Sequence, residues 1–241
     1  MKRNICLAPP FFEVGPKNYL FGSDILDLAM AVDSAAAKFD VRVIFTSPYA
    51  NIKEVASSTQ NLFVFAPYMD DDKVGRGLAN VLPESLKAAG ARGVMLNHAE
   101  RPLSLSRLIN TMKRAKNLGM MSIVCADSLS ETLAVAELRP DMMVTEPADL
   151  IGSGNAADIS YVKTSMDAVL SISPDTGVLV GGGVSNGEDV YKIISAGADA
   201  TGSSSGIACA KDPAAMVYEM LGALRAAWDD RKKGGMNNVK I

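Results

Sequence analysis

Short apolar runs alternate along the chain with longer stretches in which apolar residues recur every three or four positions. The short runs are mostly unbroken by polar residues, as expected of parallel strands whose two faces are both buried. We therefore expect eight strands, at residues 4–8, 41–46, 62–66, 93–97, 121–126, 142–146, 177–180 and 200–203.

The longer stretches have the spacing of amphipathic helices. One such helical face is formed by Leu105, Leu108, Ile109, Met112 and Ala115, and the stripe of the last helix by Met216, Met220, Leu224 and Trp228. Asp212 followed by Pro213 is typical of a helix start. Glycines that follow helical runs and precede strands mark the helix ends, at Gly90, Gly119 and Gly197.

This alternation predicts right-handed βαβ units and a parallel sheet. Eight units in 241 residues suit one closed α/β barrel, a single-domain (β/α)8 fold that typically takes about 250 residues. A doubly wound open sheet is the alternative architecture. We expect residues 1–230 to form the barrel, and the polar residues 231–241 to form a tail outside its core.

Composition narrows the class of protein. Hydrophobic residues make up 48% of the chain and the net charge is −3 without a basic cluster, so nucleic acid is not an expected partner. No apolar stretch reaches the roughly 18 residues of a membrane helix, and Pro9 and Pro10 interrupt the apolar N-terminus, so no membrane segment or signal peptide is expected. The three cysteines are far apart, which predicts neither disulfides nor a zinc site and fits a reducing cytoplasm.

Candidate catalytic residues follow the fourth and sixth strands, because active sites of such barrels lie at the carboxyl ends of the strands. The single histidine, His98, follows the fourth strand, and Glu146 ends the sixth. A carboxylate there is costly unless it is solvated, paired or used. Pro147, Gly152 and Gly154 bound a segment suited to a moving lid. The alternatives are an ordinary polar histidine and a surface glutamate before an ordinary loop.

Small-residue loops follow the last two strands. The seventh strand leads into three consecutive glycines, 181–183, and the eighth into Ser203, Ser204, Ser205 and Gly206. Glycines let the backbone approach an anion, which consecutive N–H groups then bind, and these two loops usually hold phosphate in such barrels. We expect a small phosphorylated ligand here, although a simple turn would explain the glycines alone. No cluster has metal-ligand spacing, so a metal is not expected.

Four segments, LNHAER (96–101), TEPADLIGSG (145–154), GGGVSNGEDV (181–190) and SSSGIACAKDP (203–213), resemble corresponding stretches of triosephosphate isomerases, in particular the compact archaeal form. Their order and spacing match from about residue 41 to residue 217. The resemblance implies a TIM barrel that isomerises glyceraldehyde 3-phosphate and dihydroxyacetone phosphate through an enediolate, without a cofactor. It also implies a homo-oligomer that acts in glycolysis and gluconeogenesis in the cytoplasm.

The resemblance further implies roles for single residues. His98 matches the electrophile that polarises the substrate carbonyl, Glu146 matches the base, and Lys17 matches the catalytic lysine. Residues 147–154, with Gly152, match the lid that grips phosphate. The phosphate cradle corresponds to Gly182, Gly183, Ser204, Ser205 and Gly206. Other matches are an acidic–basic pair that orders the site, Glu100 and Arg101, and a structural cysteine, Cys125.

Two places depart from the family pattern. The family has an asparagine, one residue and then the lysine, whereas here Gly15 precedes Lys17 and the nearby Glu13 could enter the site. The third loop, VGRGLA at residues 74–79, lacks the Gly-Thr-Gly-like element by which the family reaches a neighbouring subunit. These departures leave two alternatives: an isomerase of a related phosphorylated ketose such as erythrulose phosphate, and a non-catalytic barrel that binds a phosphorylated metabolite. The joint presence of Lys17, His98 and Glu146 argues against the second.

Overall fold

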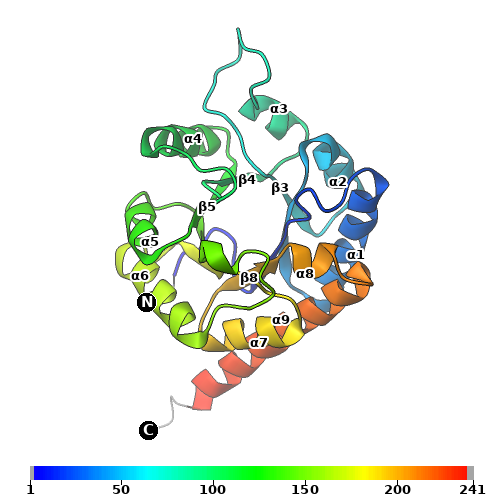
Figure 1. The fold of residues 1–241 in the computed structure, drawn as a ribbon, viewed down its shortest axis with the longest axis vertical. Coiled ribbons are helices and arrows are strands. Elements are labelled where there is room, and N and C mark those ends of the chain that lie inside the picture. Colours follow the sequence, from blue (N-terminus) through cyan, green and yellow to red (C-terminus); the bar gives the residue numbers. More distant parts are fainter. Residues whose placement is uncertain (1–2, 238–241) are drawn as a thin grey trace.

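Eight parallel strands close into a barrel in the computed structural model, which describes residues 3–237 (Figure 1). The strands are β1 (Phe11–Val14), β2 (Arg42–Thr46), β3 (Leu62–Ala66), β4 (Gly93–Leu96), β5 (Met121–Ala126), β6 (Met142–Thr145), β7 (Gly177–Val180) and β8 (Ala200–Ser203). Each strand pairs with the next along the chain, and β8 returns to pair with β1. The predicted (β/α)8 barrel is confirmed, and the doubly wound sheet is not the architecture.

Helices follow the strands and surround the barrel (Figure 1). They are α1 (Ser23–Phe39), α2 (Ile52–Ser58), α3 (Pro83–Ala88), α4 (Leu105–Asn117), α5 (Leu129–Ala136), α6 (Ile159–Ile172), α7 (Gly187–Ala196) and α9 (Pro213–Asn237). Short turns lie in the loops after β2, β6 and β8, namely η1 (Tyr49–Asn51), η2 (Ala148–Leu150) and α8 (Ser205–Ala208). At several helix starts, a side-chain oxygen accepts a hydrogen bond from a backbone N–H group of the first turn. The accepting side chains are those of Ser104, Ser128, Asp158, Asn186 and Asp212.

The apolar strand residues pack into two separate cores. Inside the barrel, one cluster includes Phe11, Ile44, Phe65, Ile123 and Met142. Alternate residues of the same strands point outwards and pack against the helices in a second, larger cluster. Both faces of each strand are therefore buried, which explains why most of the strand sequences are apolar runs.

The expectation of a first strand at residues 4–8 is wrong. That segment lies at the amino-terminal end of the barrel, where Leu7 is 2% exposed and packs against the inner cluster. The first strand is β1, which begins seven residues later than expected, and all four of its residues are buried. Its sequence hides it, because two prolines precede it and a glutamate, Glu13, occupies an interior position that normally carries an apolar residue.

The last helix continues past the boundary expected at residue 230. Residues 231–237 belong to α9, and the Arg231 guanidinium donates to the carbonyl oxygens of Ile194 and Ala198 at 3.0 and 2.7 Å. The same guanidinium lies 4.7 Å from the ring centre of Trp228. Residues 238–241 of the expected tail lie outside the described residues. Within the described range, no helix combines the length and apolar character needed to cross a membrane.

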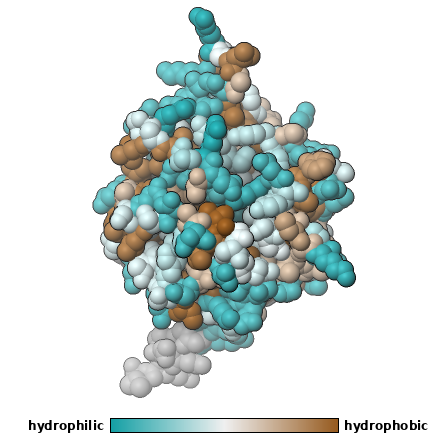
Figure 2. All heavy atoms as spheres, viewed as in Figure 1, coloured by the Kyte–Doolittle hydropathy of each residue, from teal (hydrophilic) through white to brown (hydrophobic). Residues whose placement is uncertain are grey.

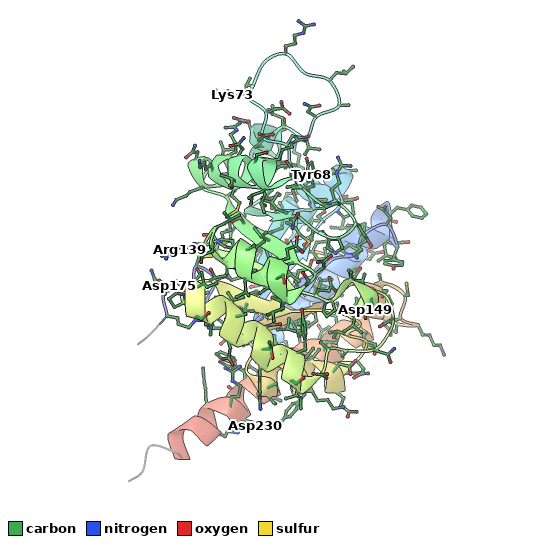
Figure 3. The ribbon with its side chains drawn as sticks, turned by 60° about the vertical axis from the view of Figure 1, so that its left-hand side comes forward. Tyr68, Lys73, Arg139, Asp149, Asp175 and Asp230 are labelled. Carbon is green, nitrogen blue, oxygen red and sulfur yellow. The ribbon has the colours of Figure 1, made fainter. Side chains whose placement is uncertain are left out.

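All strands point the same way, so their carboxyl ends share one face. In Figure 3, Arg139 and Asp175, which precede β6 and β7, lie on one side of the barrel, and Asp149, which follows β6, lies on the other. The carboxyl-end face is the one turned towards the viewer in Figure 1. A long loop between β3 and α3, with Lys73 in it, stands away from the rest of the molecule (Figures 1 and 3).

Close packing inside the barrel gives a first prediction. A Cβ added at Gly93 in β4 would lie 2.3 Å from Cζ of Phe65, an overlap that requires the ring to move. We expect Gly93→Ala to lower the free energy of unfolding by about 1–3 kcal/mol, the usual cost of overpacking a core. Denaturant unfolding measures it. The control is Gly77→Ala in the protruding loop, where an added Cβ meets nothing within 4 Å. Equal stability of the two variants would contradict this packing.

Candidate active site

A cavity of about 500 Å³ opens at the carboxyl ends of the strands. Its lining includes Lys17, His98 and Glu146, which follow β1, β4 and β6, and the small residues Gly152, Gly182, Gly183, Ser204 and Ser205. The structure thus brings together every site residue expected from the sequence except Gly206. Gly206 lies behind the cavity wall, where an added Cβ would be 2.4 Å from the carbonyl oxygen of Val184. On this face of the molecule, a small hydrophobic group lies near the centre among more hydrophilic residues (Figure 2).

Asn97 fixes the chain immediately before the histidine. It adopts the left-handed conformation, with φ of 58°, which asparagine tolerates better than most residues. Its side-chain amide donates to the carbonyl oxygen of Cys125 at 3.0 Å and to Glu131 Oε1 at 2.9 Å, while its oxygen accepts the N–H of Leu103 at 2.9 Å. No role for Asn97 was expected from the sequence. An asparagine at a strand end directly before the histidine is the signal that points to it.

The hydrogen bonds of His98 define which ring nitrogen carries the proton. Nδ1 accepts the backbone N–H of Glu100 at 3.1 Å, so the proton of the neutral ring belongs on Nε2. Nε2 faces the cavity, 3.8 Å from Oε2 of Glu146. Burial lowers the pKa of His98, and the positive charge of Lys17 lowers it further, against the raising effect of Glu100. His98 is therefore a neutral hydrogen-bond donor at neutral pH.

Glu146 extends the end of β6 into the cavity. Its N–H donates to the carbonyl oxygen of Ala126 at 3.0 Å, which continues the sheet ladder. Burial raises the pKa of its carboxyl group, while Lys17 and the backbone of Gly182 lower it. The glycine loop lies directly against this carboxylate, since a Cβ added at Gly181 would be 3.3 Å from Oε1. A carboxylate with less water around it is a stronger base than one in bulk solvent.

Lys17 reaches the cavity from the loop after β1. It too adopts a left-handed conformation, with φ of 47°, and its Nζ donates to Glu100 Oε1 at 3.1 Å. Backbone strain of this kind concentrates at functional sites. Next to Glu100, the N–H of Arg101 donates to the carbonyl oxygen of His98 at 2.7 Å, and its guanidinium lies 4.8 Å from the ring centre of Tyr68. The loop that carries His98 is thereby connected to the lysine.

The glycine loop after β7 packs against the segment 147–155, which contains the expected lid. Gly183 has φ of 65°, and an added Cβ would lie 2.1 Å from the carbonyl oxygen of Asn155, so only glycine fits. A Cβ at Gly182 would be 3.0 Å from Leu150 in the lid. Across the cavity, the hydroxyl oxygen of Ser204 is buried without a hydrogen-bond partner among the described residues. An unpaired hydroxyl beside glycine backbone that lines the cavity suits an anion with several oxygens.

Glu13 contributes a second buried carboxyl group to the same cavity. It is 9% exposed, and its Oε1 accepts the hydroxyl of Thr46 at 2.6 Å. Burial raises its pKa from 4.5 to about 7; the Thr46 hydrogen bond and Lys17 lower it, and the charge of Glu146 raises it. Within residues 3–237, no three His, Cys, Asp or Glu side chains are arranged to hold a metal ion.

Comparison with known proteins gives the family. A sequence model of the family described as triosephosphate isomerase matches residues 17–219 of the chain. The chain belongs to the triosephosphate isomerase family. The match begins at Lys17, so Glu13 and Gly15 precede the part of this isomerase that follows the family pattern.

Archaeal triosephosphate isomerases are among its relatives. The enzyme of Methanosarcina mazei is 34% identical over 220 residues, which cover 89% of this chain and 99% of the relative. That of Sulfolobus acidocaldarius is 32% identical over 219 residues, with coverage of 89% and 95%. That of Saccharolobus solfataricus is 31% identical over 225 residues, with coverage of 91% and 99%. The resemblance found in the sequence motifs is confirmed.

The buried carboxyl group of Glu13 gives a prediction on stability. A raised pKa in the folded protein means that its contribution to stability is fully present below pH 4.5 and is lost as the pH rises through about 7. The amide of Glu13→Gln cannot ionise, so the variant does not lose stability in this way as the pH rises. From acid to neutral pH, we expect the wild-type free energy of unfolding to fall relative to that of the variant by about 3 kcal/mol. Denaturant unfolding at a series of pH values measures the difference, and parallel curves would contradict the prediction.

Proposed function

We propose that this protein interconverts glyceraldehyde 3-phosphate and dihydroxyacetone phosphate by moving a proton between neighbouring carbons. The observation that carries the proposal is the placement of a partly buried carboxylate, Glu146, 3.8 Å from the donor nitrogen of a neutral His98. Both groups face one cavity that also holds a lysine and two small-residue loops. The triosephosphate isomerase names of the relatives support the same reaction.

In the proposed reaction, Glu146 removes a proton from the carbon next to the substrate carbonyl. His98 donates a hydrogen bond from Nε2 to the carbonyl oxygen, and the Lys17 ammonium stabilises the negative charge as the enediolate forms. Glu146 then returns the proton to the adjacent carbon, while the hydroxyl proton passes from the original hydroxyl oxygen to the former carbonyl oxygen, so that atoms and charge balance. A glutamate base beside a neutral histidine is the arrangement already known from triosephosphate isomerase.

The phosphate of the substrate would bind at the loops after β7 and β8. Gly182 and Gly183 offer backbone N–H groups, and Ser204 and Ser205 offer hydroxyl groups. Gly206 would act indirectly, by letting the loop after β8 pack closely on the chain behind it. These groups would contact the phosphate dianion and not the reacting carbons. A substitution that impairs proton transfer should therefore leave phosphate binding intact.

The segment from Pro147 to Gly154 would close over the bound substrate, with Gly152 above the phosphate. Gly152 and Gly154 have φ of 71° and 72°, conformations that allow a hinge near this end of the segment. Closure excludes water, which strengthens the base and protects the enediolate from losing phosphate. Family membership gives no support to the two alternatives, an erythrulose phosphate isomerase and a non-catalytic phosphometabolite-binding barrel.

Substitution of Glu146 tests the proposed reaction. Glu146→Asp keeps the charge but withdraws it by about 1 Å, and misplacement of that size costs on the order of 10²-fold in rate. Glu146→Gln removes the base and should cost more. Turnover of glyceraldehyde 3-phosphate measures both effects, while affinity for inorganic phosphate and thermal stability should change little. Glu137→Gln, at an exposed position after α5, is the control. Near-normal turnover by Glu146→Gln would overturn the mechanism.

We also propose that the protein is a homo-oligomer. The loop between β3 and α3 stands away from the molecule, and hydrophobic side chains lie near its tip (Figure 2). Val74 is 70% and Leu78 is 92% exposed there. Large apolar side chains on a protruding loop are costly in water and fit a contact with another copy of the chain.

The free thiols of Cys6, Cys125 and Cys209 support a reducing compartment such as the cytoplasm.

Substitution of Leu78 tests the oligomer. We expect Leu78→Asp to shift the protein towards the monomer, because the charge would have to be buried in the contact. Size-exclusion chromatography with light scattering measures the mass in solution. Leu133→Asp, on the surface of α5, is the matched control and should leave the mass unchanged. A monomeric wild-type protein, or equal masses for wild type and Leu78→Asp, would contradict this contact.

A further inference from the structure

We propose that the carboxyl group of Glu13 replaces the missing side chain of residue 15 and binds an oxygen of the substrate as a neutral hydrogen-bond donor. This inference rests on the proposed function and assigns it a further substrate-binding group. It starts from Gly15, which stands two residues before the lysine, where the resemblance of the sequence implies an asparagine. Glu13 lies two residues earlier, at the end of β1.

The two positions compete for one space. Residues 13 and 15 project to the same side of an extended chain. A Cβ added at Gly15 would lie 2.8 Å from Oε1 of Glu13, so the carboxyl group stands where a side chain of residue 15 would begin. The φ of Gly15 lies outside the left-handed region, so its backbone does not require a glycine. A side chain at position 15 would therefore require the Glu13 carboxyl group to leave the position in which Thr46 holds it.

The carboxyl group is held from two neighbouring strands. On β2, the Thr46 hydroxyl donates to Oε1 at 2.6 Å. On β8, Gly202 leaves room for the side chain, since an added Cβ would lie 3.0 Å from Cβ and 3.2 Å from Oε2 of Glu13. Thr46 is the hydrogen-bond partner of Glu13 within residues 3–237, and Oε2 is left for a ligand in the cavity. A group fixed in this way is preorganised for binding.

The charges around Glu13 favour its neutral form. Glu146 after β6 and the Cys125 thiol on β5 face it across the barrel, and Lys17 after β1 is the nearby cation. Burial raises the pKa of Glu13 to about 7, with Thr46 and Lys17 opposing the shift and Glu146 adding to it. A neutral carboxylic acid donates through its O–H, whereas a carboxylate would repel the enediolate and the phosphate dianion. Activity should therefore require the protonated form.

A cycle of variants tests the replacement. Glu13→Ala should lower kcat/KM for glyceraldehyde 3-phosphate about tenfold to hundredfold, the range expected for one lost substrate hydrogen bond. Gly15→Asn alone should also lower it, because the new side chain meets the carboxyl group. The double variant should recover at least about tenfold relative to Glu13→Ala, because the amide then occupies the emptied space. Groups with separate structural roles would instead give losses that multiply.

A pH profile gives the second readout. Wild-type kcat/KM should fall as the pH rises through about 7, when Glu13 ionises in the free enzyme. Glu13→Gln keeps the size and a donor but cannot ionise, so this fall should disappear. Affinity for inorganic phosphate should stay the same in Glu13→Ala, since other residues form the phosphate site. If Glu13→Ala fails to fold, the Glu13→Gln profile decides alone.

The outcomes separate this inference from the proposed function. If the wild type isomerises the triose phosphates while the losses in the cycle multiply, or while Glu13→Gln keeps the wild-type pH profile, the role of Glu13 is overturned and the proposed function stands. If the wild type does not isomerise them, the proposed function is overturned, and this inference falls with it. Recovery in the double variant together with the altered profile supports both.

Discussion

Closure of eight short parallel strands is the constraint on which the rest of the structure depends. A barrel of eight strands has a narrow interior, and side chains from opposite strands meet there. A polar group at the carboxyl end of any strand is thus brought close to polar groups from the others. Glu13 and Glu146 come from opposite parts of the sequence, yet their charges affect each other. The pKa values of these carboxyl groups thus depend on their burial and on charges from other strands, rather than on the residues next to them in the sequence.

Hydrogen bonds to the backbone hold the reacting groups in this narrow space. The N–H of Glu100 defines the tautomer of His98, and the side chain of Asn97 anchors the chain immediately before His98 through three partners. A side chain positioned in this way needs no reorganisation when charge develops on the substrate, which is the main advantage of a preorganised site. The glycine loop does the same for Glu146 by packing against its carboxylate.

Most of the fold and many of the site residues could be predicted from the sequence, for physical reasons that also explain the failures. The other seven strands are mostly apolar runs because both of their faces are buried, and their alternation with helical stretches identifies them. The strand β1 carries Glu13 inside the barrel, so the same rule misplaces it. The position of Gly206 behind the wall depends on how the loop after β8 packs against Val184, and a motif does not contain that information. The role of Asn97 depends on a backbone conformation, which the sequence only hints at.

The competition between residues 13 and 15 for one space has a consequence for the history of this sequence. A lineage that exchanges asparagine at position 15 for glutamate at position 13 by single substitutions must pass through one of two intermediates. One holds both side chains and forces the Glu13 carboxyl group out of its position; the other holds neither and leaves the pocket without a polar group there. The second is sterically permitted, so the loss of the asparagine is the easier first step. The two positions should vary together among descendants of such an ancestor, and each residue limits what the other can become.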